Sequence, residues 1–209
     1  MTMTDKIKIL IVDDHAIVRD GLGAILRFQK DMTVVGEAED GASAVEKVGR
    51  LSPDVIILDL MMPNMDGAEA TKEILKVNPK TRILLLTSYG TSIELSRAFG
   101  NGATGAITKT LPKEDLLSAI RKVAAGIRVI SPEIEQTLKE DAEMPKLSPR
   151  HLEILHSLTR GLTNDDIALE LGLSKAGVKF HLLTIFRKLN VSNRAEAIGL
   201  AMRKHLFHS

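Results

Sequence analysis

Short apolar runs alternate with amphipathic stretches through the first 125 residues of the chain. The apolar runs are rich in Ile, Val and Leu, as is typical of strands that are buried on both faces. The stretches between them repeat their apolar residues at a helical period. This alternation predicts an α/β fold, with a doubly wound, five-stranded parallel sheet and right-handed crossovers. The predicted strands cover 7–12, 33–38, 55–58, 82–87 and 105–108, and the predicted helices cover 15–29, 41–51, 66–78, 92–101 and 113–125.

The pattern changes after residue 125. Residues 126–146 contain two prolines and one short helical pattern, which predicts a linker with a short helix. The remaining chain shows helical patterns only, and it begins each of three helices with a capping residue: Ser148, Thr163 and Ser174. We predict a small all-α domain of four helices at 149–160, 164–171, 175–189 and 193–205. The predicted parts are therefore 1–125, 126–146 and 147–209.

Composition narrows the class of protein. With 44% hydrophobic and 26% charged residues the chain reads as globular, and no apolar run approaches the roughly 20 residues that cross a bilayer. The absence of cysteine excludes disulfides and thiolate metal sites. We see no signal peptide at the N-terminus and expect a cytoplasmic protein without a membrane partner.

Charge divides unevenly between the predicted parts. Residues 1–146 carry 19 Lys and Arg against 22 Asp and Glu, a balance of −3. Residues 147–209 carry 9 against 5, a balance of +4, together with five of the six histidines. A small basic part after a mildly acidic one is a weak indication of nucleic-acid binding.

Polar residues follow the predicted strands at the edge where parallel sheets bind ligands. Asp13 and Asp14 follow the first strand, Asp59 the third, Thr87 ends the fourth and Lys109 follows the fifth. A lone acid after a strand is most often a helix cap or a solvated loop residue, and a lone lysine is usually on the surface. The joint placement of three carboxylates, a hydroxyl and an ammonium on one rim favours a chemical site.

This set of groups fits phosphoryl transfer. Carboxylates and a carbonyl suit Mg²⁺, which prefers oxygen ligands. Asp59 is the candidate nucleophile, and Thr87 and Lys109 could stabilise the charge of an arriving phosphoryl group. We interpret His15 as a residue of the helix start and not as a metal ligand.

The strand ends lie in four stretches, ILIVDDHAIVRDGL, DVIILDLMMPNMDG, LLLTS and GAITK. Together these stretches resemble the flavodoxin-like receiver domain of bacterial response regulators, over about residues 5–125. Such proteins do not act as enzymes on other molecules, but assist their own phosphorylation and dephosphorylation. The resemblance implies Asp59 as phosphoacceptor, Thr87 as switch hydroxyl, Lys109 as phosphoryl partner, and Mg²⁺ ligands from Asp13, Asp14, Asp59 and the backbone carbonyl of Met61.

Two residues depart from the receiver pattern. Ala106 stands where an aromatic or large residue is usual, and Thr110 stands where many members have proline. Without an aromatic side chain at position 106, the usual rotamer switch has no ring to move. We hypothesise that the loop after Thr87, with the lone tyrosine Tyr89, carries the conformational change instead.

The predicted helix 175–189 has two different faces. Val178, Leu182, Ile185 and Leu189 lie on one side and should face a core, whereas Ala176, Phe180, Leu183 and Arg187 lie opposite. A plain solvated face would not carry Phe180 and Leu183, so a partner surface is favoured. A recognition helix in the DNA major groove uses apolar contacts to thymine methyl groups and basic contacts to phosphate or guanine. The predicted DNA contacts are Lys175, Lys179, Phe180, Leu183, Arg187, Lys188 and Arg194.

The C-terminal stretch from LSPRHLEIL to RAEAIGLAMR is similar to the LuxR-type helix-turn-helix of the NarL/FixJ subfamily, over residues 147–205. It departs at His151, where glutamate is usual, and at Gly177, where threonine is usual. Leu183 stands where relatives often have a polar or basic residue. The resemblance therefore implies DNA binding more firmly than it implies a base preference.

Taken together, the residues and the two resemblances predict a response regulator of the NarL/FixJ type that regulates transcription. A sensor histidine kinase would phosphorylate Asp59, and the phosphorylated protein would bind double-stranded DNA as a homodimer, with RNA polymerase a further possible partner. One alternative is a DNA-binding regulator that works without phosphorylation. Another is an aspartyl-phosphate phosphatase, but such enzymes have a second aspartate two residues after the nucleophile, where this chain has Met61.

Overall fold

In the computed structural model, the described residues are 6–88, 92–142, 147–203 and 206. The chain divides into two compact units, Met1–Lys139 and Glu140–Ser209. Among the described residues, no helix has both the length and the apolar character that crossing a membrane requires.

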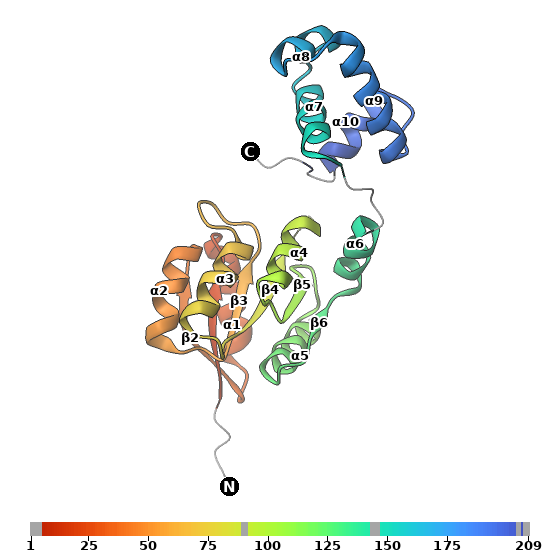
Figure 1. Ribbon diagram of the computed structural model, residues 1–209. Coiled ribbons are helices and arrows are strands. Elements are labelled where there is room, and N and C mark those ends of the chain that lie inside the picture. Colours follow the sequence, from red (N-terminus) through yellow and green to blue (C-terminus); the bar gives the residue numbers. More distant parts are fainter. Residues whose placement is uncertain (1–5, 89–91, 143–146, 204–205, 207–209) are drawn as a thin grey trace. The chain divides into compact units, whose positions relative to one another are not determined.

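The first unit contains a six-stranded sheet in the order β2-β1-β3-β4-β5-β6, and every neighbouring pair is parallel (Figure 1). The α/β prediction is confirmed, and the five predicted strands are found to within one residue at each end. The strands are β1 (Ile7–Val12), β2 (Met32–Ala38), β3 (Val55–Asp59), β4 (Arg82–Thr87), β5 (Gly105–Thr108) and β6 (Val129–Ile130), and the helices are α1 (Ala16–Arg27), α2 (Gly41–Leu51), α3 (Gly67–Val77), α4 (Ser92–Gly100), α5 (Lys113–Ala124) and α6 (Pro132–Ala142).

Helices cover both faces of this sheet. Apolar side chains of α2, α3 and α4 form one core with alternate strand residues such as Leu10 and Val12. Side chains of α1 and α5 form the other core with the intervening residues Ile9 and Ile11. Every residue of β3 is buried, which is the pattern expected for a central strand of a parallel sheet. The two cores fix the strands rigidly, and so they fix the groups at the strand ends.

The sixth strand lies inside the segment predicted to be a linker. Val129 and Ile130 pair with Gly105 and Ala106 of β5, and the Ser131 N–H donates to the Ala106 carbonyl at 3.0 Å. Helix α6 follows at once, and its Ile134 is buried in the core that α2, α3 and α4 share. The prediction of five strands was therefore one strand short, because a strand of two residues is too brief to show a period.

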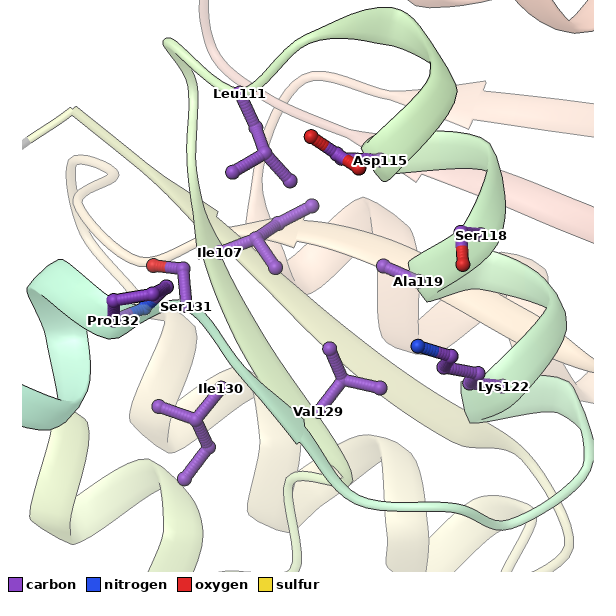
Figure 2. A pocket seen from close by; sticks show the side chains of 10 residues that line it. All are labelled: Ile107, Leu111, Asp115, Ser118, Ala119, Lys122, Val129, Ile130, Ser131 and Pro132. Atoms are coloured by element: carbon purple, nitrogen blue, oxygen red, sulfur yellow. The ribbon is translucent and has the colours of Figure 1, made fainter.

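A pocket of about 300 Å³ separates β6 from the middle of α5. Figure 2 shows Ile107 of β5 and Val129 of β6 on one side of it, and Asp115, Ala119 and Lys122 of α5 on the other. β6 is held by its backbone pairing with β5, by the burial of α6, and by Val129 and Ile130, which pack against the two cores of the sheet.

The described residues of the second unit form helices, as predicted (Figure 1), and their buried side chains form a single core. Ser148, Thr163 and Ser174 each accept a backbone N–H at a helix start, and Thr163 forms a full capping box with Asp166. The helices are α7 (Pro149–Thr159), α8 (Asn164–Glu170), α9 (Lys175–Leu189) and α10 (Arg194–Arg203). The predicted core face of α9 is confirmed, because Val178, Leu182, Ile185 and Leu189 are buried.

Candidate functional site

The backbone brings the ends of four strands together at one edge of the sheet. Asp59 is the last residue of β3 and pairs with Leu86, which precedes Thr87 at the end of β4. Thr87 in turn pairs with Thr108, the residue before Lys109. Asp13 follows β1, the neighbour of β3 on the other side. The pairing register therefore places these side chains on one rim, as the sequence predicted.

Lys109 bridges two buried carboxylates. Its Nζ lies 2.9 Å from Asp59 Oδ2 and 2.6 Å from Asp13 Oδ2. The two acids are 4% and 1% exposed. A buried carboxylate without a partner is costly, so one ammonium between two of them offsets part of their desolvation and mutual repulsion.

The site holds more negative charge than Lys109 can neutralise. Asp14 is partly exposed beside Asp13, and potential ligand atoms of Asp13, Asp14, His15 and Asp59 all lie within 4.8 Å of one another. Such a set of carboxylate oxygens could hold a hard divalent cation.

His15 touches the acids, which the sequence did not reveal. It is the N-cap of α1, in agreement with the interpretation as a helix-start residue. Its backbone N–H donates to Asp13 Oδ1 at 2.9 Å, and its Nδ1 lies 2.7 Å from Asp14 Oδ1. The spacing Asp-Asp-His was the available signal, because a residue directly after a strand end can fold back on the carboxylates before it.

Burial and pairing act on the same two groups. Burial raises the pKa of Asp59, and this effect exceeds the opposing influence of Lys109. Burial alone would lower the pKa of Lys109, but its hydrogen bonds to Asp13 and Asp59 prevail and raise it. The lysine therefore stays charged, whereas the charge on Asp59 is held in an environment that disfavours it.

Thr87 carries a buried hydroxyl that makes no hydrogen bond within the described part of the chain. The Thr87 side chain is 2% exposed. A buried unpaired hydroxyl is a recognised exception in folded proteins, and it is expected where a ligand oxygen completes the bonding. The switch role of Thr87 stays a prediction, and Tyr89, in the loop after it, lies outside the described residues.

The loop after Asp59 returns close to its own strand. The Met61 N–H donates to Asp59 Oδ1 at 3.4 Å, while a metal contact of the Met61 carbonyl stays a prediction. Asp66 caps α3, and the Gly67 N–H donates to the Leu60 carbonyl at 2.9 Å. The first residue of α3 is thereby fixed against the residue that follows Asp59.

On the second unit, α9 exposes five of the seven residues predicted to contact DNA. Phe180 and Leu183 are 67% and 68% exposed, and Lys179 and Arg187 are exposed beside them. Lys175 is also exposed, but its Nζ lies 2.8 Å from a carboxylate oxygen of Asp165 on α8. Lys188 is half-buried.

Arg194 has a contact set that the sequence did not predict. Its Nη2 donates to the carbonyl of Leu162 at 2.6 Å and to that of Leu158 at 3.3 Å. These bonds join the start of α10 to the end of α7. A DNA contact of Arg194 stays a prediction, and it would compete with these internal bonds.

Two histidines meet between α7 and α9. The rings of His151 and His181 pack edge to face with centroids 5.6 Å apart. Burial lowers the pKa of His151, and the charge of Lys188 and the neighbouring His181 lower it further. The departure at position 151 thus places a titratable ring against the helix that carries Phe180 and Leu183.

Comparisons with known proteins assign both units. Residues 9–121 match the family model of the response regulator receiver domain. Residues 145–201 match the model of bacterial regulatory proteins of the luxR family. These matches confirm both resemblances inferred from the sequence motifs.

Whole proteins of the same organisation are similar along nearly the entire chain. The response regulator protein VraR of Staphylococcus aureus strain Mu3 is 38% identical over 205 residues, covering 96% of this chain and 98% of that protein. The crystal structure of the response regulator ChrA, from a heme-sensing two-component system, has a TM-score of 0.60 and 36% identity over 97% of this chain and 99% of ChrA. Salmonella enterica serovar Typhimurium RcsB, bound to a promoter with the phosphomimetic BeF3−, has a TM-score of 0.71 and 26% identity over 95% of this chain and 99% of RcsB.

Proposed function

The chain belongs to the response regulators of two-component systems that join a receiver domain to a LuxR-type DNA-binding domain, and we propose that phosphorylation of Asp59 controls its binding to DNA. The observation that carries this proposal is the joint position of three groups. Lys109 lies 2.9 Å from Asp59, and the buried Thr87 hydroxyl on the next strand has no partner among the described residues. Together they offer an ammonium and a hydroxyl to the oxygens of a phosphoryl group on Asp59.

The acidic residues fit Mg²⁺ as the metal of this site. Asp13, Asp14 and Asp59 present oxygen donors, which match the ligand preference of Mg²⁺, and the Met61 carbonyl is the proposed fourth protein ligand. When bound, Mg²⁺ supplies positive charge that neutralises the carboxylates and the transferred phosphoryl group. The carboxylates of this chain would hold the ion. An Asp59 carboxylate oxygen forms a bond to the phosphorus of the donor as the bond between that phosphorus and the donor's leaving group breaks, and the leaving group departs with the electron pair. Lys109 and Thr87 bind the phosphoryl oxygens as charge develops.

The phosphoryl donor in the cell is proposed to be a sensor histidine kinase. In this role the phosphoryl group is transferred to Asp59 of the chain itself, which is the only proposed nucleophile. We assign it as a phosphoacceptor and not as an enzyme acting on other molecules. A regulator that works without phosphorylation is disfavoured. In such a protein the buried Asp13 and Asp59 and the unpaired Thr87 hydroxyl would lower stability and serve no function.

Labelling of the full-length protein tests the site. Incubation with acetyl phosphate and Mg²⁺ should add one phosphoryl group, as seen by intact-protein mass spectrometry, and Asp59→Asn should remove that addition. Asp54→Asn is the matched control, because Asp54 precedes the same strand at its opposite end and accepts the Lys8 N–H at 2.8 Å. Full labelling of Asp59→Asn would reject Asp59 as the phosphoacceptor.

The proposed output is DNA binding by the exposed side of α9. Lys175, Lys179, Phe180, Leu183, Arg187, Lys188 and Arg194 form the proposed contact set, and a DNA contact of Arg194 would compete with its bonds to the Leu158 and Leu162 carbonyls. Two helix-turn-helix domains on neighbouring half-sites multiply a limited individual affinity, so we propose a homodimer after phosphorylation. Light scattering with and without beryllofluoride should show the mass double, and an unchanged monomer with full DNA affinity would reject the dimer.

The remaining assignments follow from this role. The proposed division is a receiver over 1–125, a connecting segment over 126–146 and a DNA-binding part over 147–209, with β6 and most of α6 lying against the first of these. A regulator that meets a kinase and DNA is proposed to work in the cytoplasm, with RNA polymerase as a possible further partner.

A further inference from the structure

The exposed side of α9 has an unusual chemical content for a helix that is to read bases. Its exposed residues are Lys175, Ala176, Lys179, Phe180, Leu183 and Arg187. Along the whole helix, KAGVKFHLLTIFRKL, there is no Asp, Glu, Asn or Gln. The bidentate amide contact to adenine and the carboxylate contact to cytosine are therefore unavailable from α9.

Few other polar side chains lie on α9, and two of them already make contacts within the protein. Lys175 Nζ lies 2.8 Å from a carboxylate oxygen of Asp165. The Thr184 hydroxyl donates to the Phe180 carbonyl at 3.0 Å within the helix. Lys179 and Arg187 remain as exposed cations at either side of Phe180 and Leu183.

Phe180 and Leu183 are three residues apart, so their side chains are neighbours on one helix face. Each leaves about two thirds of its surface exposed. Toward the start of the helix, Ala176 is small and exposed, and Gly177 has no side chain at all. A helix start with small residues can approach base edges closely, and its exposed apolar residues then enter the groove.

In the major groove, the C5 methyl of thymine is the apolar group on a base-pair edge. We propose that α9 selects DNA through thymine methyl groups, which Leu183 and Phe180 contact, while Lys179 and Arg187 bind phosphate or guanine. This inference rests on the proposed DNA binding and names its base preference. The positive charge beside the apolar pair, with no acid on the helix, favours DNA over a protein as the occupant of this face.

The test removes the methyl group and nothing else. Two random duplex pools are prepared, one with thymine and one with uracil in its place, and each is selected on the full-length protein with Mg²⁺ and beryllofluoride. The thymine pool should yield an enriched sequence, and the uracil pool should yield weak enrichment or none. In the enriched duplex, replacing a contacted thymine by uracil should weaken binding by about fourfold, the effect of about 0.8 kcal/mol for one buried methyl.

A double-mutant cycle, which combines a protein substitution with the replacement of thymine by uracil, assigns each methyl contact to a residue. Leu183→Ala should bind the thymine duplex more weakly and lose most of the preference for thymine over uracil at one position, because both changes remove the same contact. Phe180→Ala should do the same at a neighbouring position. Leu169→Ala is the matched control, since Leu169 is a leucine of α8 that is 87% exposed, and it should keep the full preference.

The possible failures are distinguishable. Equal affinity for thymine and uracil duplexes, with binding that still weakens in salt, would overturn the inference and leave the proposed DNA binding in place. Unchanged thymine preference in both Leu183→Ala and Phe180→Ala would also overturn it, because other residues would then contact the methyl groups. Failure of both pools to enrich any sequence would overturn the proposed function and the inference together.

Discussion

A side chain at position 67 would begin 2.4 Å from the backbone carbonyl oxygen of Asp59. The same Cβ would lie 2.8 Å from the Cα of Leu60, so both obstacles are backbone atoms and neither can rotate away. Gly67 opens α3 directly against the strand end that presents Asp59. The glycine is thus required by close approach and not by an unusual backbone angle.

Gly67→Ala should therefore disturb the phosphoacceptor itself. We expect the substitution to lower the free energy of unfolding by about 1–3 kcal/mol, as overpacking does, and to slow labelling of Asp59 by acetyl phosphate. Gly21→Ala is the control, since Gly21 lies within α1 and a Cβ there would meet no heavy atom within 4 Å apart from its chain neighbours and the backbone of its own helix. The control should gain up to about 1 kcal/mol of stability through helix propensity. Denaturant unfolding and mass spectrometry measure both effects, and normal labelling of Gly67→Ala would contradict the expectation.

Thr87→Val should separate stability from signalling. The Thr87 hydroxyl is buried without a partner among the described residues, so its replacement by a methyl should stabilise the unphosphorylated protein by about 1 kcal/mol. The same change removes a proposed phosphoryl contact and should weaken the effect of beryllofluoride on DNA binding.

Thr81→Val is the matched comparison, because Thr81 is equally buried but its hydroxyl donates to the Pro53 carbonyl at 2.8 Å. Its loss should destabilise the protein by about 1–3 kcal/mol. Thermal unfolding ranks the stability of the unchanged protein, Thr87→Val and Thr81→Val. An equal loss of stability in the two variants would show that the Thr87 hydroxyl has a hydrogen-bond partner.

Alanine substitutions of Arg194 and Arg187 should differ in their effects on stability and on the salt dependence of DNA binding. Arg194→Ala leaves the carbonyls of Leu158 and Leu162 without their donor, so it should cost about 1–3 kcal/mol of stability. Arg187→Ala should leave stability nearly unchanged and reduce the salt slope of DNA binding by about 0.9, the effect of one phosphate contact. A flattened slope with normal stability in Arg194→Ala would instead place Arg194 on the DNA.

Acid should destabilise the second unit through His151. Its pKa is lowered in the folded protein by burial and then by Lys188 and His181. As pH falls below about 6.5, the unfolded chain binds the proton first, so stability is lost from there down to the lowered folded pKa.

His151→Gln should lose less stability between pH 7 and pH 5.5 than the unchanged protein does. Thermal unfolding of the full-length protein at the two pH values gives the comparison. An identical loss in His151→Gln would assign the acid sensitivity to other groups.

The grouping of the site residues was predictable, because the carboxyl ends of parallel strands lie at the same edge of a sheet. Asp13, Asp59, Thr87 and Lys109 each follow or end a short apolar run rich in Ile, Val and Leu, which predicts a buried strand. The internal role of Arg194 was not predictable, because an arginine at a helix start reads alike whether it binds phosphate or carbonyls. The contact between His151 and His181 depends on the packing of α7 against α9, which a local pattern does not contain.

The two-residue strand β6 has a consequence for self-association. It occupies the edge of the sheet beside β5, where the Ala106 carbonyl would otherwise lack the Ser131 N–H as donor. An uncovered parallel edge is a template for strands of other molecules, and very short edge strands are one device by which proteins prevent such growth. A chain shortened at residue 125 would leave the edge of β5 uncovered in this way, so we expect it to aggregate more readily than the full-length chain.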